Sequence, residues 1–220
     1  MTIQLFGASV SPYYERVLVF LDMKGALDQV ELCSVPGGFK SGAHIEHHPL
    51  GMIPFLIKED GSSLTESQLI MLYLDSVLIG PKQLPVNIDA AIQTQAIARV
   101  FDLYYGAAVK PFGAAYFGGE VDEAAMETAR GGEIQKVFGY VEKYMDGGQH
   151  AVGTDRTMAD AVLIVQLYWY HRIGQTFELP ALARFPKLKS YWENINRCDY
   201  ALRSIGRIET SYSNFSGKPS

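Results

Sequence analysis

The chain has 220 residues, which is enough for one large domain or two small ones. Hydrophobic residues make up 48% of it and aromatic residues 12%, so we expect a folded core rather than disorder. The net charge of -5 and the absence of a basic run argue against a protein that binds nucleic acid by neutralising phosphates. No apolar stretch approaches the roughly 20 residues that span a membrane, so we expect a cytoplasmic protein without membrane contact.

The first third of the chain predicts a small sheet with helices. A helix is expected over 12–24, because Ser11 is a good N-cap and Pro12 suits the first helical position. Another helix follows Thr65, capped by Thr65 or Ser67, and ends near Leu78. Apolar runs with turn signals between them predict strands at 3–6, 29–35, 53–58 and 63–65. The resulting order, β-α-β-α-β-β-α, is that of a thioredoxin-like domain, whose first two strands are parallel.

The rest of the chain predicts helices only. Residues 79–89 contain two prolines and break every periodicity, so we interpret them as a linker between a domain at 1–78 and an all-helical domain at 90–220. The helical domain should contain long helices over 90–117, kinked at Pro111, and over 122–145, bent at its two glycines. A capping box at 157–160 precedes a buried helix, others follow 185 and 199, and a polar tail covers 210–220.

The cysteines and histidines predict no metal site. Cys33 and Cys198 are far apart and in no Cys-x-x-Cys arrangement, so neither a disulfide framework nor a zinc site is expected. His44, His47 and His48 show no ligand spacing, and we expect them in a solvated loop.

Ser11 is the first candidate for chemistry. A hydroxyl at a helix N-terminus lies among unpaired backbone N–H groups and the positive end of the macrodipole, where it can stabilise an anion such as a thiolate. A plain helix cap explains Ser11 equally well from its position alone.

Four segments together resemble the cytosolic glutathione transferase family, and the resemblance covers nearly the whole chain. They are 11–17 after the first strand, 48–56, 65–67 and 153–160. The family's Asn-Pro before the third strand is His48-Pro49 here. The resemblance implies a thioredoxin-like domain followed by an all-α domain, glutathione as cosubstrate, no metal, a role in detoxification and a homodimer.

The resemblance also implies a glutathione site. Ile53 and Pro54 match the family's cis-proline site, where the backbone of Ile53 pairs with the peptide. Glu66 would bind the γ-glutamyl ammonium, while the backbone N–H and hydroxyl of Ser67 would take its carboxylate. Lys40 would contact the glycyl end.

The residue at position 11, in the turn before the first helix, decides which chemistry to expect. Glutaredoxins and omega-class transferases carry a cysteine where this chain has Ser11, so a mixed-disulfide mechanism lacks its nucleophile here. We therefore expect a Ser-type enzyme, similar to tau, zeta or omega relatives, in which Ser11 acts on the glutathione thiol. Tyr13 is expected to contact glutathione, and both Ser9 and Tyr13 are rivals of Ser11 as thiol activator. Phe6 occupies the place of the tyrosine of Tyr-dependent classes and cannot donate.

The predicted function is conjugation of glutathione to a hydrophobic electrophile. The kinked helix carries the aromatic residues expected to line the electrophile site, in a cleft facing Ser11: Tyr104, Tyr105, Phe112 and Tyr116. Two alternatives stay open. One is an omega-like or zeta-like glutathione-dependent lyase, isomerase or thiol transferase, and the other is a glutathione-binding module without turnover.

Overall fold

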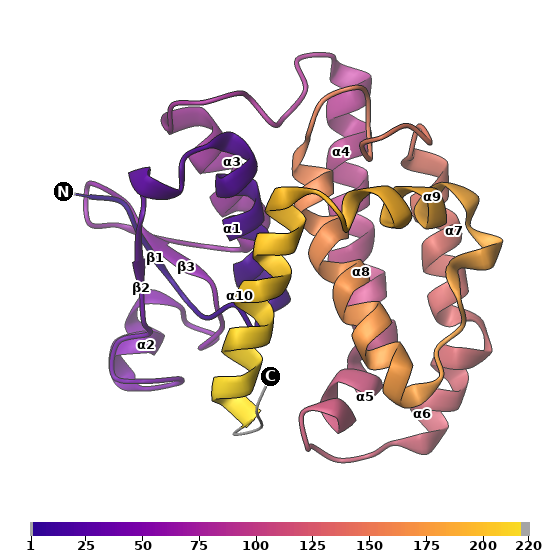
Figure 1. Ribbon diagram of the computed structural model, residues 1–220. Coiled ribbons are helices and arrows are strands. Elements are labelled where there is room, and N and C mark those ends of the chain that lie inside the picture. Colours follow the sequence, from indigo (N-terminus) through magenta and orange to yellow (C-terminus); the bar gives the residue numbers. More distant parts are fainter. Residues whose placement is uncertain (1, 217–220) are drawn as a thin grey trace. The chain divides into compact units, whose positions relative to one another are not determined.

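A computed structural model of the chain describes residues 2–216 (Figure 1). Within this range the chain forms two compact units. Unit 1 comprises residues 2–84 together with 199–216, and unit 2 comprises residues 85–198.

A four-stranded mixed sheet forms the centre of unit 1. Its strands are β1 (Gln4–Phe6), β2 (Glu31–Cys33), β3 (Phe55–Ile57) and β4 (Ser63–Thr65), in the spatial order β2-β1-β3-β4. The pair β1 and β2 is parallel, whereas β3 is antiparallel to both of its neighbours, as in a thioredoxin-like sheet. Phe6 lies opposite Cys33 on one side and Phe55 on the other, and its ring stacks on that of Phe55 with centroids 4.6 Å apart.

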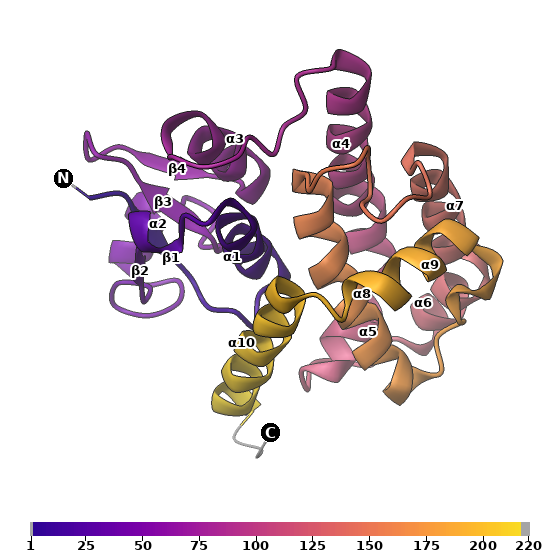
Figure 2. The same cartoon turned by 45° about the horizontal axis from the view of Figure 1, so that its top comes forward.

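Helices α1 (Pro12–Lys24) and α3 (Ser67–Val77) pack against each other beside the sheet (Figure 2). The helix α1 is almost entirely buried, with Val17 and Phe20 both inaccessible to solvent. It ends at Gly25, whose left-handed φ of 67° lets its N–H bond to the carbonyl of Asp22. A short helix, α2 (Gly42–His47), connects β2 to β3, and η1 (Leu27–Gln29) connects α1 to β2.

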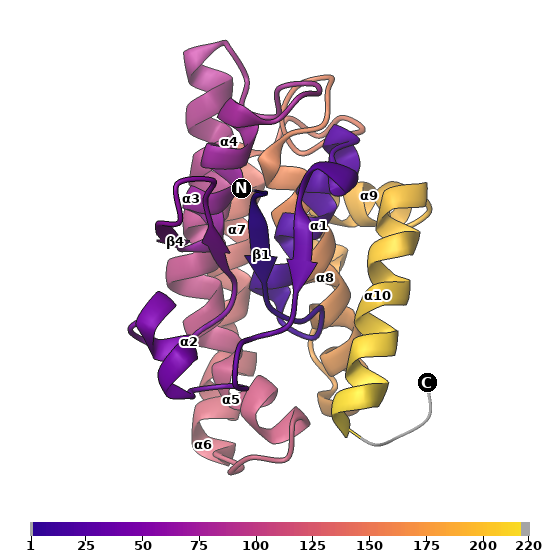
Figure 3. The same cartoon turned by 90° about the vertical axis from the view of Figure 1, so that its left-hand side faces the viewer.

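The C-terminal helix differs from the sequence prediction. Instead of a short helix and a polar tail, α10 (Asp199–Ser216) runs for 18 residues and packs alongside α1 (Figure 3). Ala201, Ser204 and Ile208 are fully buried at helical spacing, which explains why so polar a segment holds its structure. The last four residues of the predicted tail lie outside the described residues. The compact units thus place α10 with the sheet, not with residues 90–198 as the sequence interpretation did.

A buried ion pair joins the end of α1 to α3 within unit 1. Lys24 Nζ donates to Asp75 Oδ1 at 3.0 Å, and both side chains are almost inaccessible. The same ammonium donates to the carbonyl of Pro81 at 2.9 Å, and Gln83 Nε2 donates to the carbonyl of Phe20 at 2.8 Å. The first half of the expected linker is therefore part of unit 1, and the division between the units falls after Leu84.

Unit 2 is all-helical within residues 85–198. Two interruptions divide its first long helices: η2, a π-helical turn at the end of α4, and η3, a second one after α6. At η3 Gly132 leaves the helical conformation, with φ 160° and ψ -16°, so the expected bend is present there. Pro111 lies inside α5, ten residues after Phe101, the first residue of η2. The elements are α4 (Ile88–Val100), η2 (Phe101–Tyr105), α5 (Gly106–Tyr116), α6 (Glu123–Thr128), η3 (Ala129–Glu133), α7 (Ile134–Tyr144), α8 (Met158–Phe177), η4 (Leu182–Arg184) and α9 (Pro186–Ile195).

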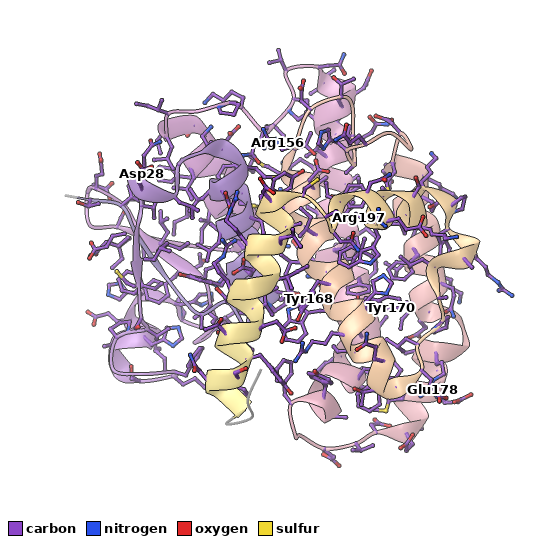
Figure 4. All side chains as sticks on the ribbon, viewed as in Figure 1. Asp28, Arg156, Tyr168, Tyr170, Glu178 and Arg197 are labelled. Carbon is purple, nitrogen blue, oxygen red and sulfur yellow. The ribbon has the colours of Figure 1, made fainter. Side chains whose placement is uncertain are left out.

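The helix α8 is the core of unit 2. Residues 158–170 are all buried, and the predicted capping box at its start is confirmed, because Asp160 Oδ2 accepts from the N–H of Thr157 at 2.7 Å. Asp160 Oδ1 also accepts from the N–H of Ala151, so one carboxylate secures both the helix and the preceding loop. Figure 4 labels Tyr168 and Tyr170 on this helix, and Glu178, which ends it in a left-handed conformation.

Candidate functional site

The turn before α1 presents Ser11 as the N-cap. Its Oγ accepts from the N–H of Tyr14 at 3.4 Å, and its backbone N–H closes the turn by donating to the carbonyl of Ala8 at 2.9 Å. The hydroxyl is half-buried and serves here as an acceptor, so its hydrogen remains available to a bound group. The position thus combines a hydroxyl donor with the positive end of a 13-residue helix.

The two tyrosines that follow differ in accessibility. The Tyr13 ring is half-exposed and lies under the guanidinium of Arg16, 5.0 Å from its carbon. Tyr14 is buried and packs on Gly7 so closely that a Cβ at Gly7 would lie 2.2 Å from Tyr14 Cδ2. Burial, helped by the charge of Glu15, raises the pKa of Tyr14 to about 12. Tyr14 therefore stays protonated at neutral pH.

Ser9, the expected rival of Ser11, lies beside a buried carboxylate. This is Glu15, which pairs with Arg207 through Nη2 at 2.7 Å and Nε at 2.9 Å. The nearby hydroxyls of Ser9 and Ser204 help to hold the pKa of Glu15 down. Burial raises the pKa of Glu15, while the Arg207 guanidinium opposes that rise. Sequence reasoning missed this cluster, and the adjacent charges Glu15 and Arg16, directly before the apolar run 17–21 of α1, are the signal that indicates it.

His44 connects two segments that carry expected glutathione contacts. Its Nδ1 accepts from the N–H of Lys40 at 3.0 Å, so Nε2 carries the hydrogen and donates to the carbonyl of Met52 at 2.9 Å. The ring is fully buried and stacks on Phe55 with centroids 5.5 Å apart. His48 is buried as well. The expectation of a solvated histidine loop is wrong for these two residues, because α2 packs its His44 face against β3.

The segment that leads into β3 comes directly after Met52 in the sequence. The Ile53–Pro54 peptide bond is cis, with Ile53 half-buried and Pro54 buried. Lys40 is exposed and has a left-handed φ of 59°, and its side chain lies against Gly51, where a Cβ would be 3.1 Å from Lys40 Cγ.

The first turn of α3 has no side-chain cap. Neither Thr65 nor Ser67 caps the helix: Thr65 ends β4, and the N-cap is Glu66, whose side chain makes no capping hydrogen bond. Glu66 is exposed and has φ 68°, a conformation that costs about 1–3 kcal/mol in a residue other than glycine and is concentrated at functional sites. Ser67 is 3% exposed. The first-turn N–H groups of α3 can therefore accept an anionic ligand.

His48 borders this helix start. Burial lowers its pKa, the charge of Glu66 opposes that shift, and nearby His44 reinforces it. Its Nδ1 has no hydrogen-bond partner among residues 2–216.

The aromatic residues expected at an electrophile site divide into two groups. Tyr105 and Phe112 are 2% and 0% exposed and belong to the core of unit 2, where Tyr105 stacks on Phe138. Tyr104 is 54% exposed, and Tyr116 is half-buried with its hydroxyl accepting from Arg172 Nε at 2.8 Å. The helical period explains the split, because Tyr104 and Tyr105 must point to different sides of one helix.

Metal ligands do not gather anywhere in the part of the chain that the structure describes, where no three His, Cys, Asp or Glu side chains form a group. The two cysteines are free thiols, Cys33 on β2 and Cys198 after α9. Among residues 2–216, no helix is both long and apolar enough to cross a membrane.

A small mixed sheet with helices, followed along the chain by a helical region, is the fold of glutathione transferases. Two family models match the chain: the glutathione S-transferase N-terminal domain over residues 5–78 and the glutathione S-transferase C-terminal domain over residues 108–199. Together they cover most of its length. The chain therefore belongs to the glutathione transferase family.

Solved structures agree on the fold. Glutathione transferase F7 from Populus trichocarpa is 22% identical, with 94% of this chain and 99% of that chain covered and a TM-score of 0.76. A family member from Pseudomonas fluorescens Pf-5 with bound glutathione is 22% identical, with 92% and 98% covered and a TM-score of 0.75. Glutathione S-transferase I from maize, in complex with an atrazine glutathione conjugate, is 20% identical, with 96% and 100% covered and a TM-score of 0.74. No curated protein matches by sequence.

Proposed function

We propose that the protein is a Ser-type glutathione transferase, in which the Ser11 hydroxyl stabilises the glutathione thiolate and the sulfur attacks a hydrophobic electrophile. The single observation that carries the proposal is the geometry of Ser11, an N-cap whose oxygen accepts from Tyr14 while its hydrogen remains to donate. The likeness to a structure with bound glutathione and to one with a glutathione conjugate supports the substrate class.

One hydroxyl and one helix N-terminus can together supply the free energy needed to stabilise the thiolate. Lowering a thiol pKa from about 8.5 to about 6.5 takes about 2.7 kcal/mol of preference for the anion. A hydrogen bond to a charged sulfur supplies about 1.5–3 kcal/mol. A helix N-terminus adds about 0.3–2 kcal/mol.

Glutathione would lie along the segments described above. The backbone of Ile53, next to Pro54, pairs with the cysteinyl part of the peptide, as an added strand does. Glu66 binds the γ-glutamyl ammonium, and the open start of α3 at Ser67 binds its carboxylate, in agreement with the uncapped first turn. Lys40 contacts the glycyl carboxylate. Tyr13, half-exposed one residue into α1, adds a side-chain contact.

For the electrophile we retain Tyr104 and Tyr116 as the contributors from unit 2, because both keep accessible surface. Tyr105 and Phe112 are removed from the proposed site, since side chains that are 2% and 0% exposed have almost no surface with which to contact a substrate. The role we assign is cytoplasmic detoxification.

The deciding experiment titrates glutathione bound to the protein by the ultraviolet absorbance of its thiolate. Ser11→Ala should raise the thiol pKa by about one to two units and lower the conjugation rate at least about tenfold. Asn87→Ala is the matched control, because it also deletes an N-cap, that of α4, at a similar cost in stability. Equal thiol pKa values in wild type and Ser11→Ala would leave Ser11 a plain cap and defeat the mechanism.

A third variant separates the related chemistries. Ser11→Cys places a thiol at the helix start, where it should ionise and attack glutathione disulfides, which shifts activity from conjugation toward thiol transfer. Tight glutathione binding without turnover of any electrophile in the wild type would instead identify a binding module.

We further propose that the protein is a homodimer, the state usual among soluble oligomers. Light scattering should then give about twice the chain mass of 24.4 kDa. A strictly monomeric species at micromolar concentration contradicts this proposal.

A further inference from the structure

The loop that carries Ser11 is held from the far end of the sequence. The backbone N–H of Val10, directly before Ser11, donates to Ser211 Oγ at 3.0 Å, a contact between residues 201 positions apart. Ser211 lies on α10, in the same compact unit as the loop. An N–H that precedes an N-cap residue has no partner within the helix, so this hydroxyl supplies one.

A second connection lies one turn back along α10. Arg207 pairs with the inaccessible carboxylate of Glu15 through Nη2 and Nε, and Ser9 lies near the same carboxylate. The N–H of Glu15 in turn donates to the carbonyl of Ser11 at 3.0 Å. Arg207 thus holds the side chain of the residue whose backbone N–H bonds to Ser11.

A third contact also joins α10 to α1, but it does not involve the loop that carries Ser11. Arg203, one further turn back, forms two hydrogen bonds with Asp22 near the end of α1, at 2.7 and 2.9 Å. The three α10 residues are four positions apart and meet α1 and its preceding loop in reverse order, so the two helices run antiparallel along this seam. Figure 3 shows α10 beside α1.

We propose that α10 positions the thiol-activating loop and that Ser211 and Arg207 are positioning residues for Ser11. The inference rests on the proposed role of Ser11. A hydroxyl that stabilises a thiolate must be held within about 0.5 Å of its productive place, and a loop residue achieves this only through neighbouring contacts. Ser211 fixes the backbone on the N-terminal side of Ser11, and Arg207 fixes Glu15 on its C-terminal side.

The cavity beside Ser211 also explains why removing the Ser211 hydroxyl need not unfold the protein. Ser9, Arg207 and Ser211 line an open cavity of about 650 Å³. Water that enters this open hollow can replace the deleted hydroxyl as the acceptor for the Val10 N–H. Removal of Ser211 Oγ should therefore change the geometry of the loop more than its stability.

The test uses Ser211→Ala, with Ser211→Thr as the conservative rescue and Thr210→Ala as the matched control. The Thr210 hydroxyl bonds only to the carbonyl of Gly206 in its own helix. Ser211→Ala should speed amide hydrogen exchange at Val10, raise the pKa of bound glutathione by about half a unit to one unit and lower kcat about three- to tenfold. The KM for glutathione should stay within about twofold, because the peptide contacts lie elsewhere. Thr210→Ala should match the wild type in every readout, and Ser211→Thr should restore it.

The two arginines provide an independent comparison. Arg203→Met deletes the ion pair with Asp22, whereas Arg207→Met deletes the ion pair with Glu15 and a longer one to Asp22 at 3.5 Å. Because both variants lose a contact to Asp22, they differ chiefly in the pair with Glu15, the residue whose N–H bonds to the Ser11 carbonyl. Arg207→Met should raise the thiol pKa, whereas Arg203→Met should leave it unchanged. Equal effects of the two variants would mean that α10 acts only through general stability and would overturn the proposal.

The outcomes also separate this inference from the proposed function. If Ser11→Ala raises the thiol pKa but Ser211→Ala changes neither that pKa nor exchange at Val10, only the positioning role fails. If Ser11→Ala itself has no effect on the thiol, the proposed function fails, whatever exchange at Val10 shows.

Discussion

His44 Nε2 lies 2.9 Å from the carbonyl oxygen of Met52, while Nδ1 of the same ring accepts from the N–H of Lys40. One imidazole therefore sets the distance between the lysine loop and the segment that enters β3. Both segments carry proposed glutathione contacts, so the ring should control affinity without touching the ligand.

His44→Phe should weaken glutathione binding about five- to tenfold, because it keeps the ring on Phe55 and removes both hydrogen bonds. His47→Phe is the control, since His47 also stacks on Phe55 with centroids 5.5 Å apart but contacts neither Lys40 nor Met52. Calorimetry on both variants decides, and equal affinity would show that the two segments hold their places without His44.

Glu66→Gln should weaken glutathione binding by about 2–3 kcal/mol, because the γ-glutamyl ammonium loses its counter-charge while the shape of the side chain is kept. The fold should be unaffected at this exposed position, as circular dichroism can verify. Glu59→Gln removes an equal charge from the exposed turn after β3 and should bind as the wild type does. Unchanged affinity in Glu66→Gln means that the glutathione site is misplaced.

Asp75→Ala should destabilise unit 1 by about 3–5 kcal/mol, because it leaves the buried ammonium of Lys24 without its counter-ion. Both tryptophans, Trp169 and Trp192, lie in unit 2, so amide hydrogen exchange in α1 and α3 is the appropriate measure for unit 1.

The double variant Lys24→Met with Asp75→Leu should be less destabilised than Asp75→Ala, since no buried charge remains. Lys189→Met removes an exposed pair with Glu193 at 3.7 Å and should cost no more than about 0.5 kcal/mol. If Asp75→Ala costs as little stability as Lys189→Met, the Lys24–Asp75 pair does not have the stabilising role assigned to it.

The stability of unit 1 should fall as pH decreases through the histidine range. Burial lowers the folded-state pKa of His48 below the unfolded value of about 6.5, so below that pH the unfolded chain binds more protons and is favoured. His48→Asn should flatten the dependence of exchange in α3 on pH below about 6.5. His171 in unit 2 also has a lowered pKa, and His171→Asn should leave the exchange of α3 unchanged. An identical pH slope in His48→Asn and the wild type would exclude His48 as the titrating group.

Local signals in the sequence predict the elements near the site well. Ser11 with Pro12 predicts the start of α1, and Thr157 with Asp160 predicts that of α8, because a cap is a contact between residues three positions apart. The sequence also predicts a helix after β4. Its actual N-cap, Glu66, was not predicted, because φ 68° reflects the surroundings of the residue and not its propensity.

Contacts between distant residues are what the sequence does not reveal. His44 was expected in solvent, and no periodicity shows that Lys40 and Met52 approach it from both sides. Ser211 was assigned to a polar tail, although Ala201, Ser204 and Ile208 are spaced as one helical face. A face of small and polar residues is a weak signal until its partner, α1, is known.

The assignment of α10 to unit 1 places unit 2, along the sequence, between the two segments of one compact unit. During synthesis the sheet and its first helices emerge well before the segment that completes them. At about 5–20 residues per second the insert alone occupies the ribosome for roughly ten seconds. Throughout that delay the side of α1 that α10 later covers, with Glu15 and Asp22 on it, stays uncovered. The acidic pair keeps that surface hydrated and like-charged while it waits, which disfavours its association with other nascent chains.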